Sequence, residues 1–139
     1  MTITKSRYKY AIRRSAHGLG FFTLEAIPKG KRIIEYTGAR ISNDEVDKRH
    51  WGKYFFGLNT RSSVDGSPRS NTARYINHSC RPNAEAIVTR GRIWIWSKRA
   101  IRAGEEITYN YGKEYFDEHI KPKGCKCQKC EASQTKRGR

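Results

Sequence analysis

The segment from Asn71 to Asn83, which reads Asn-Thr-Ala-Arg-Tyr-Ile-Asn-His-Ser-Cys-Arg-Pro-Asn, constrains the fold of this chain more than any other. It is too polar for a core element, and it lacks the glycines of a flexible linker. Residues 73–76 can form one short helical turn, but Pro82 disfavours helical backbone at the residue before it. We therefore expect Asn77 and His78 to lie at an irregular chain reversal, where side chains and backbone can face a ligand. An ordinary polar turn would fit the same pattern.

Length and charge limit the class of protein. A chain of 139 residues suits a single domain with a modest core. Its 29 Lys and Arg against 13 Asp and Glu give a net charge of +16, which favours nucleic acid, an anionic membrane surface or an acidic protein as partner. Residues 1–9 lack the apolar run of a signal peptide, and nothing later approaches membrane-spanning length. We expect a soluble protein of the cytoplasm, or of the nucleoid if it is microbial; a nuclear or secreted location also stays open.

Short β-branched and aromatic segments between turns predict a mostly-β domain with few short helices. The expected strands cover residues 8–13, 21–24, 32–41, 54–58, 63–65, 84–89, 92–97 and 106–111. Ser42 and Glu45 form a capping box that predicts a helix to about residue 49. Trp94 and Trp96 alternate with two isoleucines, so we expect their strand to be buried on both faces.

Two turn-and-strand segments resemble each other at a fixed offset. Ala26, Ile27, Gly30, Ile33 and Gly38 recur as Ala100, Ile101, Gly104, Ile107 and Gly112. The matches are too few to indicate a duplication, and they indicate two similar turns that each lead into a strand.

The chain has four cysteines, of which Cys125, Cys127 and Cys130 stand close together. In an intracellular protein such spacing favours a metal over a disulfide. Tetrahedral zinc takes four ligands, and Cys80 is the only cysteine left to complete the set. Such a zinc would join the C-terminal segment to the central motif. Free thiols, or His119 as the fourth ligand, are the alternatives.

Two glycines, Gly18 and Gly20, stand in the segment 15–20, which we expect to be a loop. They permit positive φ and let a ligand approach bare backbone, although a tight hairpin would explain them equally well. No amphipathic helix follows, so a dinucleotide-binding fold is excluded.

The segment Asn77-His78-Ser79-Cys80, followed by Pro82-Asn83, resembles the central motif of the SET-domain protein lysine methyltransferases. Four further motifs stand in the order typical of the family: Gly18-Leu19-Gly20, Glu35-Tyr36-Thr37-Gly38, Gly104-Glu105-Glu106-Ile107-Thr108-Tyr109-Asn110-Tyr111 and Cys125-Lys126-Cys127-Gln128-Lys129-Cys130. Together the motifs span residues 18 to 130. Asn110 replaces the usual aspartate, and the last two cysteines are closer together than in the family.

The resemblance implies a fold of several small curved sheets with a pseudoknot, in which the segment Asn71–Cys80 and the last strand are threaded together. It implies a SET domain over residues 7–117, a zinc-binding post-SET tail over 118–132 and a disordered basic tail over 133–139. No pre-SET region precedes Tyr8, which would fit a minimal, stand-alone form.

The resemblance also implies an activity, the transfer of a methyl group from S-adenosylmethionine to a protein lysine. It implies the following roles: Tyr111, Tyr36 and Tyr109 in catalysis; Gly18, Leu19, Gly20, Tyr54, Arg74, Asn77 and His78 in holding the cofactor; and Cys80, Cys125, Cys127 and Cys130 in holding structural zinc. A tyrosine at 109 rather than phenylalanine implies mainly monomethylation.

Tyrosines suit this chemistry, although a strand tyrosine is more often simply a core aromatic with a satisfied hydroxyl. A narrow aromatic sleeve excludes water, holds the aliphatic stem of lysine and aligns its nitrogen. Desolvation beside a cationic sulfonium also lowers the pKa of the lysine amine, so no carboxylate base is required.

The partner is expected to be a lysine-bearing protein, such as a histone or a nucleoid-associated protein, with possible non-specific contact to nucleic acid through the basic surface. The alternative is a basic, zinc-containing module that binds nucleic acid or protein without catalysis. Its basic residues are scattered along the sequence, and no known nucleic-acid motif appears.

Overall fold

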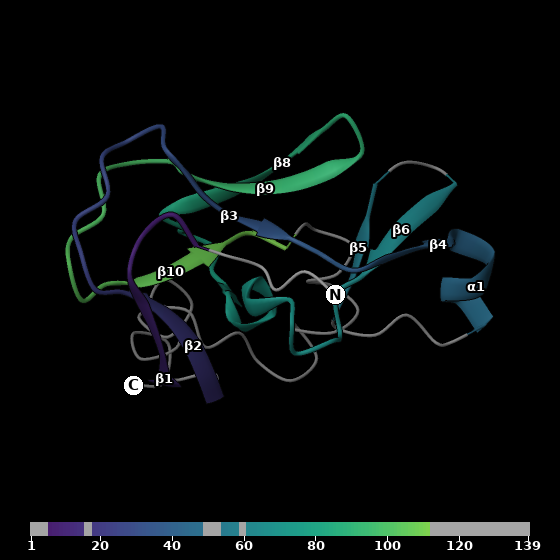
Figure 1. Cartoon of the computed structure of the whole chain (residues 1–139), viewed down its shortest axis with the longest axis horizontal. Helices are drawn as coiled ribbons and strands as arrows, with labels where there is room; N and C mark the ends of the chain where they lie inside the picture. Colours follow the sequence, from purple (N-terminus) through teal and green to yellow (C-terminus); the bar gives the residue numbers. More distant parts are fainter. Residues whose placement is uncertain (1–5, 16–17, 49–53, 59–60, 112–139) are drawn as a thin grey trace, which may run out of the picture.

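The computed structural model describes residues 6–15, 18–48, 54–58 and 61–111 (Figure 1). Within them the chain forms three small sheets, as the mostly-β prediction required, with strand orders β1-β2-β10-β7, β3-β9-β8 and β4-β6-β5. The elements are β1 (Tyr10–Ser15), β2 (Gly18–Thr23), β3 (Arg32–Tyr36), β4 (Ala39–Ser42), α1 (Asn43–Lys48), β5 (Phe55–Gly57), β6 (Ser62–Asp65), η1 (Thr72–Tyr75), β7 (Asn77–His78), β8 (Ala84–Thr89), β9 (Arg92–Ser97) and β10 (Glu106–Tyr109). No helix in these ranges has both the length and the apolar character that crossing a membrane requires.

The first sheet begins with the antiparallel β1–β2 hairpin, whose register runs from Tyr10 opposite Thr23 to Ser15 opposite Gly18. The prediction of a loop over residues 15–20 is therefore wrong for Gly18 and Gly20, which belong to β2. Strand pairing continues because Gly18 adopts φ 98° at no steric cost. The Tyr10 ring stacks on Phe21 at 4.7 Å between centroids, which fixes the hairpin on the core.

The central motif is more regular than its sequence indicates. Residues 72–75 form the predicted short helical turn, here a 3-10 helix. Asn77 and His78, however, form a strand rather than an irregular reversal, and both are buried. They pair in parallel with Thr108 and Tyr109 of β10. The central motif and the last strand thus lie side by side, as the expected pseudoknot requires.

The second sheet contains the predicted β8–β9 hairpin, with Arg90 (φ 52°) and Gly91 (φ 76°) at its turn. Two left-handed residues give the tight turn whose twist suits a hairpin. Ile93 and Ile95 are fully buried, whereas Trp94 and Trp96 are only half-buried. The prediction that β9 is buried on both faces is therefore wrong for its tryptophan face.

The third sheet joins β4, β6 and β5, and α1 lies beside it (Figure 1). The expected strand 32–41 is divided at Thr37 and Gly38, because β3 pairs with β9 while β4 pairs with β6. Gly38 lies so close to β6 that a Cβ there would be 1.9 Å from the Asp65 carbonyl oxygen. The predicted N-cap is present, since the Glu45 N–H donates to Ser42 Oγ at 3.2 Å.

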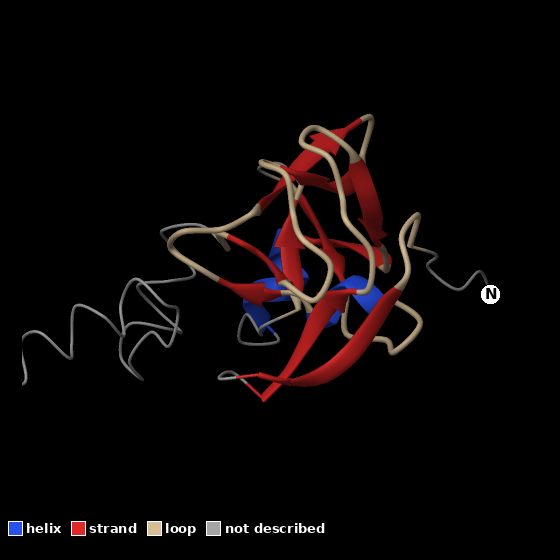
Figure 2. Cartoon of the chain, turned by 90° about the vertical axis from the view of Figure 1, so that its left-hand side faces the viewer, coloured by secondary structure: helices blue, strands red, loops and turns tan. Residues whose placement is uncertain are grey.

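The core between the sheets is made mainly of isoleucines. The fully buried ones are Ile27, Ile33, Ile34, Ile76, Ile93, Ile95, Ile101 and Ile107. Ile27 and Ile101, which occupy matching positions in the two similar turn-and-strand segments, bond to each other through both backbone N–H groups. The β8–β9 and β1–β2 hairpins extend from opposite sides of this core (Figure 2).

Candidate active site

Parallel pairing of β7 with β10 brings His78 to Tyr111. The Tyr111 backbone N–H donates to His78 Nδ1 at 3.1 Å, and the two rings meet edge to face at 5.5 Å. The Tyr111 hydroxyl donates to the Ile76 carbonyl oxygen through a very short hydrogen bond. Because Nδ1 accepts, the proton of a neutral His78 is on Nε2. Both ends of Tyr111 are therefore fixed by the central motif.

An aromatic row continues from Tyr111 across the molecule. Ring centroids lie 4.9 Å apart from Tyr111 to Tyr109, 6.3 Å from Tyr109 to Phe56, and 5.5 Å from Phe56 to Tyr36. The structure thus brings together all three tyrosines with predicted catalytic roles, although they come from separate segments. Phe56 was not predicted as a site residue. Only the tertiary structure shows that its ring joins Tyr36 to Tyr109.

Tyr36 is held tightly at the end of β3. Its hydroxyl donates to the Tyr54 carbonyl oxygen at 2.8 Å. A Cβ on Gly66 would lie 2.3 Å from the Tyr36 ring, so glycine makes room for that ring. Buried Asn71 accepts from the Thr37 N–H and donates to the Gly66 carbonyl oxygen, both at 3.0 Å. Asn71 thereby fixes the two segments that flank Tyr36.

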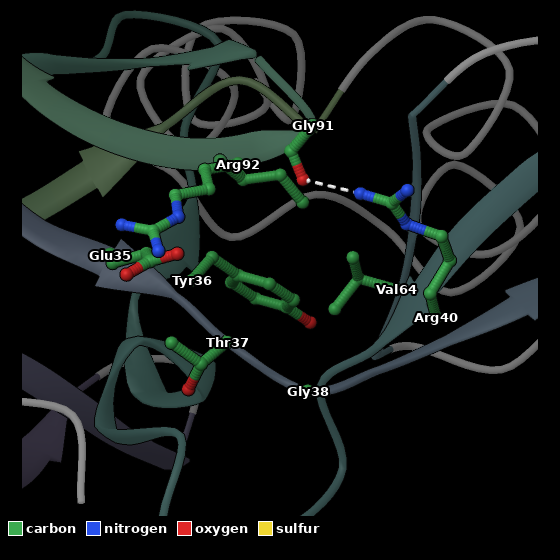
Figure 3. A pocket seen from close by; sticks show the side chains of 9 residues that line it. Glu35, Tyr36, Thr37, Gly38, Arg40, Val64, Gly91 and Arg92 are labelled. Atoms are coloured by element: carbon green, nitrogen blue, oxygen red, sulfur yellow. Dashed lines mark hydrogen bonds between the residues drawn. The ribbon is translucent and has the colours of Figure 1, made fainter. Parts of the chain in front are cut away.

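A hollow of about 270 Å³ opens beside Tyr36 (Figure 3). The Tyr36 side chain lies between Thr37 and Val64 in this view, and Arg40 closes one end by donating to the Gly91 carbonyl oxygen at 3.0 Å. The lining residues are Glu35, Tyr36, Thr37, Gly38, Arg40, Val64, Gly91, Arg92 and Ile93. The outer end of the aromatic row is therefore next to a solvent-accessible hollow.

Asn77 joins the central motif to the glycine segment. Its Nδ2 group lies within donating distance of the Leu19 carbonyl oxygen (2.9 Å), Glu106 Oε2 (2.9 Å) and Ser15 Oγ (3.2 Å). Gly20 stands beside this cluster, where a Cβ would lie 2.4 Å from Glu106 Oε2. Glu106 was not predicted as a site residue, although its alternation with Ile107 and Tyr109 in β10 already placed it on the face away from the core.

Arg74 and Tyr54, also predicted on the cofactor side, lie together. The Arg74 guanidinium is 4.4 Å from the centroid of the Tyr54 ring and 5.2 Å from that of Tyr75. Its Nε is buried and has no hydrogen-bond partner among the described residues. A buried donor without a partner is costly in free energy.

Cys80 is half-buried, and its Sγ lies 3.4 Å from His78 Nε2. The other three cysteines lie outside the described residues, as do the predicted tail over 118–132 and the predicted disordered segment 133–139. Residues within the described part form no group of three or more potential metal ligands. Zinc binding by the four cysteines therefore stays a prediction.

Asn83, at the end of the central motif, fixes the start of β10. Its amide donates to the Glu106 carbonyl oxygen at 2.8 Å and accepts from the Thr108 N–H at 3.0 Å. Just before β10, burial would raise the pKa of the Glu105 carboxyl, but bonds from Arg99 and from the Arg102 backbone outweigh burial and lower that pKa. The strand that leads to Tyr111 is thus anchored at its first residues.

Comparison with known proteins decides the family, because the SET-domain profile matches residues 18–112. The chain belongs to the SET-domain family. The match begins at Gly18 and includes β7, which holds Asn77 and His78, as well as β10 and Tyr111, which follows it. The family is known for S-adenosylmethionine as its cofactor, in agreement with the predicted motifs.

Relatives of this SET domain include three named histone-lysine N-methyltransferases. Trithorax of Drosophila virilis is 36% identical over 91% of the chain, and MEDEA of Arabidopsis thaliana is 36% identical over 76%. An H3 lysine-4 specific enzyme of Mycosarcoma maydis is 36% identical over 77%. The chain matches only 4%, 17% and 8% of these relatives' lengths, respectively.

Proposed function

We propose that this SET domain transfers a methyl group from S-adenosylmethionine to the side-chain amine of a protein lysine. The observation that carries the proposal is the aromatic row from Tyr36 through Phe56 and Tyr109 to Tyr111. It ends at a tyrosine whose hydroxyl and backbone are both held by the central motif. An array of this kind suits a flexible cationic side chain, because ring faces favour the aliphatic stem and the ammonium alike.

The residues present fit the cofactor. Leu19, which is 49% exposed, and neighbouring Gly18 leave backbone open beside Asn77. Asn77 directs its Nδ2 group to protein acceptors, which leaves Oδ1 for the cofactor's ammonium. Arg74 Nε, which has no hydrogen-bond partner among the described residues, would offer a further donor. When bound, S-adenosylmethionine supplies a methyl group activated by its sulfonium.

The residues of this chain would act by position and by exclusion of water. Tyr36, Tyr109 and Tyr111 hold the lysine stem and align its nitrogen, which favours an in-line approach. The buried environment disfavours the charged form of the amine, so the substrate proton is lost without a protein carboxylate. The Tyr111 hydroxyl donates to the Ile76 carbonyl oxygen, and because a hydroxyl oxygen can also accept a hydrogen bond, it would help to orient the substrate nitrogen.

The substrate class follows from the relatives' names and from charge. Three relatives are named for histone lysines, one of them for H3 lysine 4. A net charge of +16 would repel an isolated basic tail. We propose a histone or nucleoid protein that is presented on nucleic acid or beside acidic patches, because opposite charge speeds encounter. Chromatin or a nucleoid would then be the place of action.

Structural zinc is part of the proposal. Cys80, Cys125, Cys127 and Cys130 would hold it, with residues 118–132 as the post-SET tail and 133–139 as a basic extension. Cys80 Sγ already lies within hydrogen-bond distance of His78 Nε2. A metal-bound thiolate there would accept that proton, a contact that fixes the ring orientation of the histidine. The zinc would thus connect the tail to the cofactor side.

A non-catalytic basic module is the competing function. Its support is the charge of +16 and the cysteine cluster. It does not explain why Tyr36 and Tyr109, each 5% exposed, are aligned with Tyr111. A pure binding module needs its aromatic side chains at the surface, so we favour catalysis.

A methyl-transfer assay tests the proposal. The full chain is incubated with tritium-labelled S-adenosylmethionine and either free histones or nucleosomes. We expect labelled histone from the wild type and a loss of about a hundredfold or more in Tyr111→Phe, since that hydroxyl acts at the reacting centre. Calorimetry should show unchanged binding of S-adenosylhomocysteine in that variant.

Tyr10→Phe, the same chemical change in β1, is the control and should keep wild-type activity. Wild-type protein that binds S-adenosylhomocysteine but labels no lysine would support a silent binding scaffold instead. Equal activity of wild type and Tyr111→Phe would refute the catalytic role.

A further inference from the structure

The outer face of the β3-β9-β8 sheet carries a concentration of arginines that the proposed reaction does not use. Arg32, Arg90 and Arg92, together with Thr89 and Trp94, line a hollow of about 470 Å³. We call these five residues the arginine surface. Strand alternation turns it away from Ile93 and Ile95, which face the core. The hollow contains three guanidinium groups and no carboxylate among its lining residues.

Arg32 is held rigidly in this surface. It stands opposite Trp96 in the sheet, and its guanidinium lies 4.3 Å from the Trp94 ring and 5.1 Å from the Trp96 ring. Its Nε is buried and has no hydrogen-bond partner among the described residues. Stacking on two rings thus holds the Arg32 guanidinium in place, and no carboxylate of the described residues pairs with it. Because the side chain is already ordered, it loses little further entropy when a ligand binds.

The hairpin turn presents the other two cations. Arg90 adopts φ 52° at the turn, and Arg92 begins β9 with its side chain exposed. Arg40 donates to the Gly91 carbonyl oxygen at 3.0 Å, which ties the turn to β4. Glu35 lies near Arg92 (Figure 3) and offsets one charge, so the surface keeps a net positive balance.

We propose that the arginine surface binds the phosphodiester backbone of a nucleic acid duplex. All three cations are arginines, whose planar forks match phosphate oxygens better than a lysine ammonium does. Arg90 and Arg92 stand on the β8–β9 hairpin and Arg32 on the neighbouring β3, so the three cations border one hollow that a backbone phosphate can enter. The surrounding +16 charge would add sequence-independent attraction. None of these residues belongs to the aromatic row, so this inference does not depend on the proposed catalysis.

Fluorescence anisotropy with a labelled 20-base-pair DNA duplex and the full chain tests the proposal. The test variant is Arg90→Asn/Arg92→Gln, because asparagine tolerates the left-handed backbone at position 90. Its matched control is Arg13→Gln/Arg14→Gln, which removes two exposed arginines from β1 at the opposite side of the molecule (Figure 2). The titrations are run between 50 and 200 mM KCl, roughly the range in which phosphate contacts dominate affinity.

We expect the test variant to bind about tenfold or more weakly, with its log–log salt slope reduced by roughly 1.8, or 0.9 for each lost phosphate contact. The affinity of the control variant for the duplex should fall by less than about threefold. In a Trp51→Phe background, duplex should also change the emission of Trp94 and Trp96. Thermal melting checks folding, and Arg92→Glu alone serves if the double variant is unstable.

An equal loss of duplex affinity in the test and control variants would overturn the proposal, since binding would then depend on the overall charge of the protein. Failure of the wild type to bind duplex at 50 mM KCl would also overturn it. Polyglutamate displacing the duplex at equal charge concentration would identify an acidic protein as the partner instead. Binding only to phosphatidylserine vesicles would identify a membrane surface.

Discussion

Three buried asparagines, Asn71, Asn77 and Asn83, define the site at the scale of single residues. Asn71 and Asn83 use both ends of their amides to join segments that are distant in sequence. The Asn77 amino group lies within donating distance of three protein acceptors, which are the Leu19 carbonyl oxygen, Glu106 Oε2 and Ser15 Oγ. A buried amide is stabilising only when its donors and acceptor are paired. Each asparagine therefore specifies one arrangement of its neighbours, which an apolar side chain could not do.

Tyr109 is predicted to limit the number of methyl groups added. Its ring lies 4.9 Å from that of Tyr111 and is buried. A hydroxyl there can hold a water in the space that a methylated amine needs to rotate into line. The hydrogen bond that holds this water, worth about 1 kcal/mol, disfavours each further methylation roughly five-fold. We expect monomethyl-lysine from the wild type and a shift to dimethyl-lysine in Tyr109→Phe.

Mass spectrometry of a histone substrate after exhaustive turnover measures the product ratio, with Tyr10→Phe as the control for loss of a distant hydroxyl. If the wild type yields trimethyl-lysine, or if Tyr109→Phe leaves the ratio unchanged, Tyr109 only packs.

At the scale of elements, β10 is the strand on which the site depends. It pairs with β2 on one side and with β7 on the other, so the glycine segment and the central motif meet across it. Its residues alternate between Ile107 and Tyr109, which are buried, and Glu106 and Thr108 on the opposite face. One short strand thereby places Tyr109 beside the Tyr111 ring and Glu106 beside Asn77.

Gly20 and Glu106 are predicted to be energetically coupled. A Cβ at Gly20 would lie 2.4 Å from Glu106 Oε2 and 3.2 Å from Asn77 Nδ2. The carboxylate end is flexible, so we expect Gly20→Ala to fold but to displace Glu106 from Asn77. Loss of that hydrogen bond should weaken S-adenosylhomocysteine binding about five-fold.

A double-mutant cycle measures this coupling by calorimetry. The double variant Gly20→Ala/Glu106→Ala should bind S-adenosylhomocysteine only slightly more weakly than Glu106→Ala does. Without the carboxylate, the alanine at position 20 no longer clashes with residue 106. Gly57→Ala in β5 is the control, since no atom of the described residues lies within 4 Å of its Cβ position. Strictly additive losses would show that Gly20 acts on the cofactor without Glu106.

At the scale of the whole molecule, three small sheets share one core, and the site lies where they meet. Each sheet supplies one part of the aromatic row: Tyr36 comes from β3, Phe56 from β5 and Tyr109 from β10. No single hairpin contains the row, so the row depends on how all three sheets pack together. The relative positions of the sheets therefore control the spacing of the rings in the row.

One zinc ion per chain is predicted to join the C-terminal cysteines to Cys80. Structural zinc binding is coupled to folding, so loss of any ligand should release the metal and destabilise the protein. Cys80→Ser and Cys127→Ser should both lose zinc, and both should lower the melting temperature to a similar extent. His119→Ala should keep one equivalent and serves as control.

Elemental analysis of freshly purified, reduced protein measures the metal content. Absence of zinc in the wild type would contradict the site. Zinc loss in His119→Ala together with retention in Cys80→Ser would instead identify the histidine as the fourth ligand.

The mostly-β class, the β8–β9 hairpin, the helical cap at Ser42 and the identity of the motifs could all be predicted from the amino-acid sequence. These features depend on local chemistry: alternation of apolar residues, a glycine turn and a capping hydroxyl act over a few positions. Family resemblance added which tyrosines and asparagines to expect at the site. The structure places those expected residues that it describes close to one another.

How the motifs meet could not be predicted, because it depends on contacts between segments that are distant in the sequence. β7 is a strand because β10 supplies its hydrogen bonds, and the segment 32–41 divides because its halves pair with different strands. Phe56 and Glu106 take part in the site through contacts with residues far along the chain. Trp94 and Trp96 are half-exposed because Arg32, rather than another sheet, covers them. Such non-local pairings depend on which surfaces meet in space, and no local pattern specifies that.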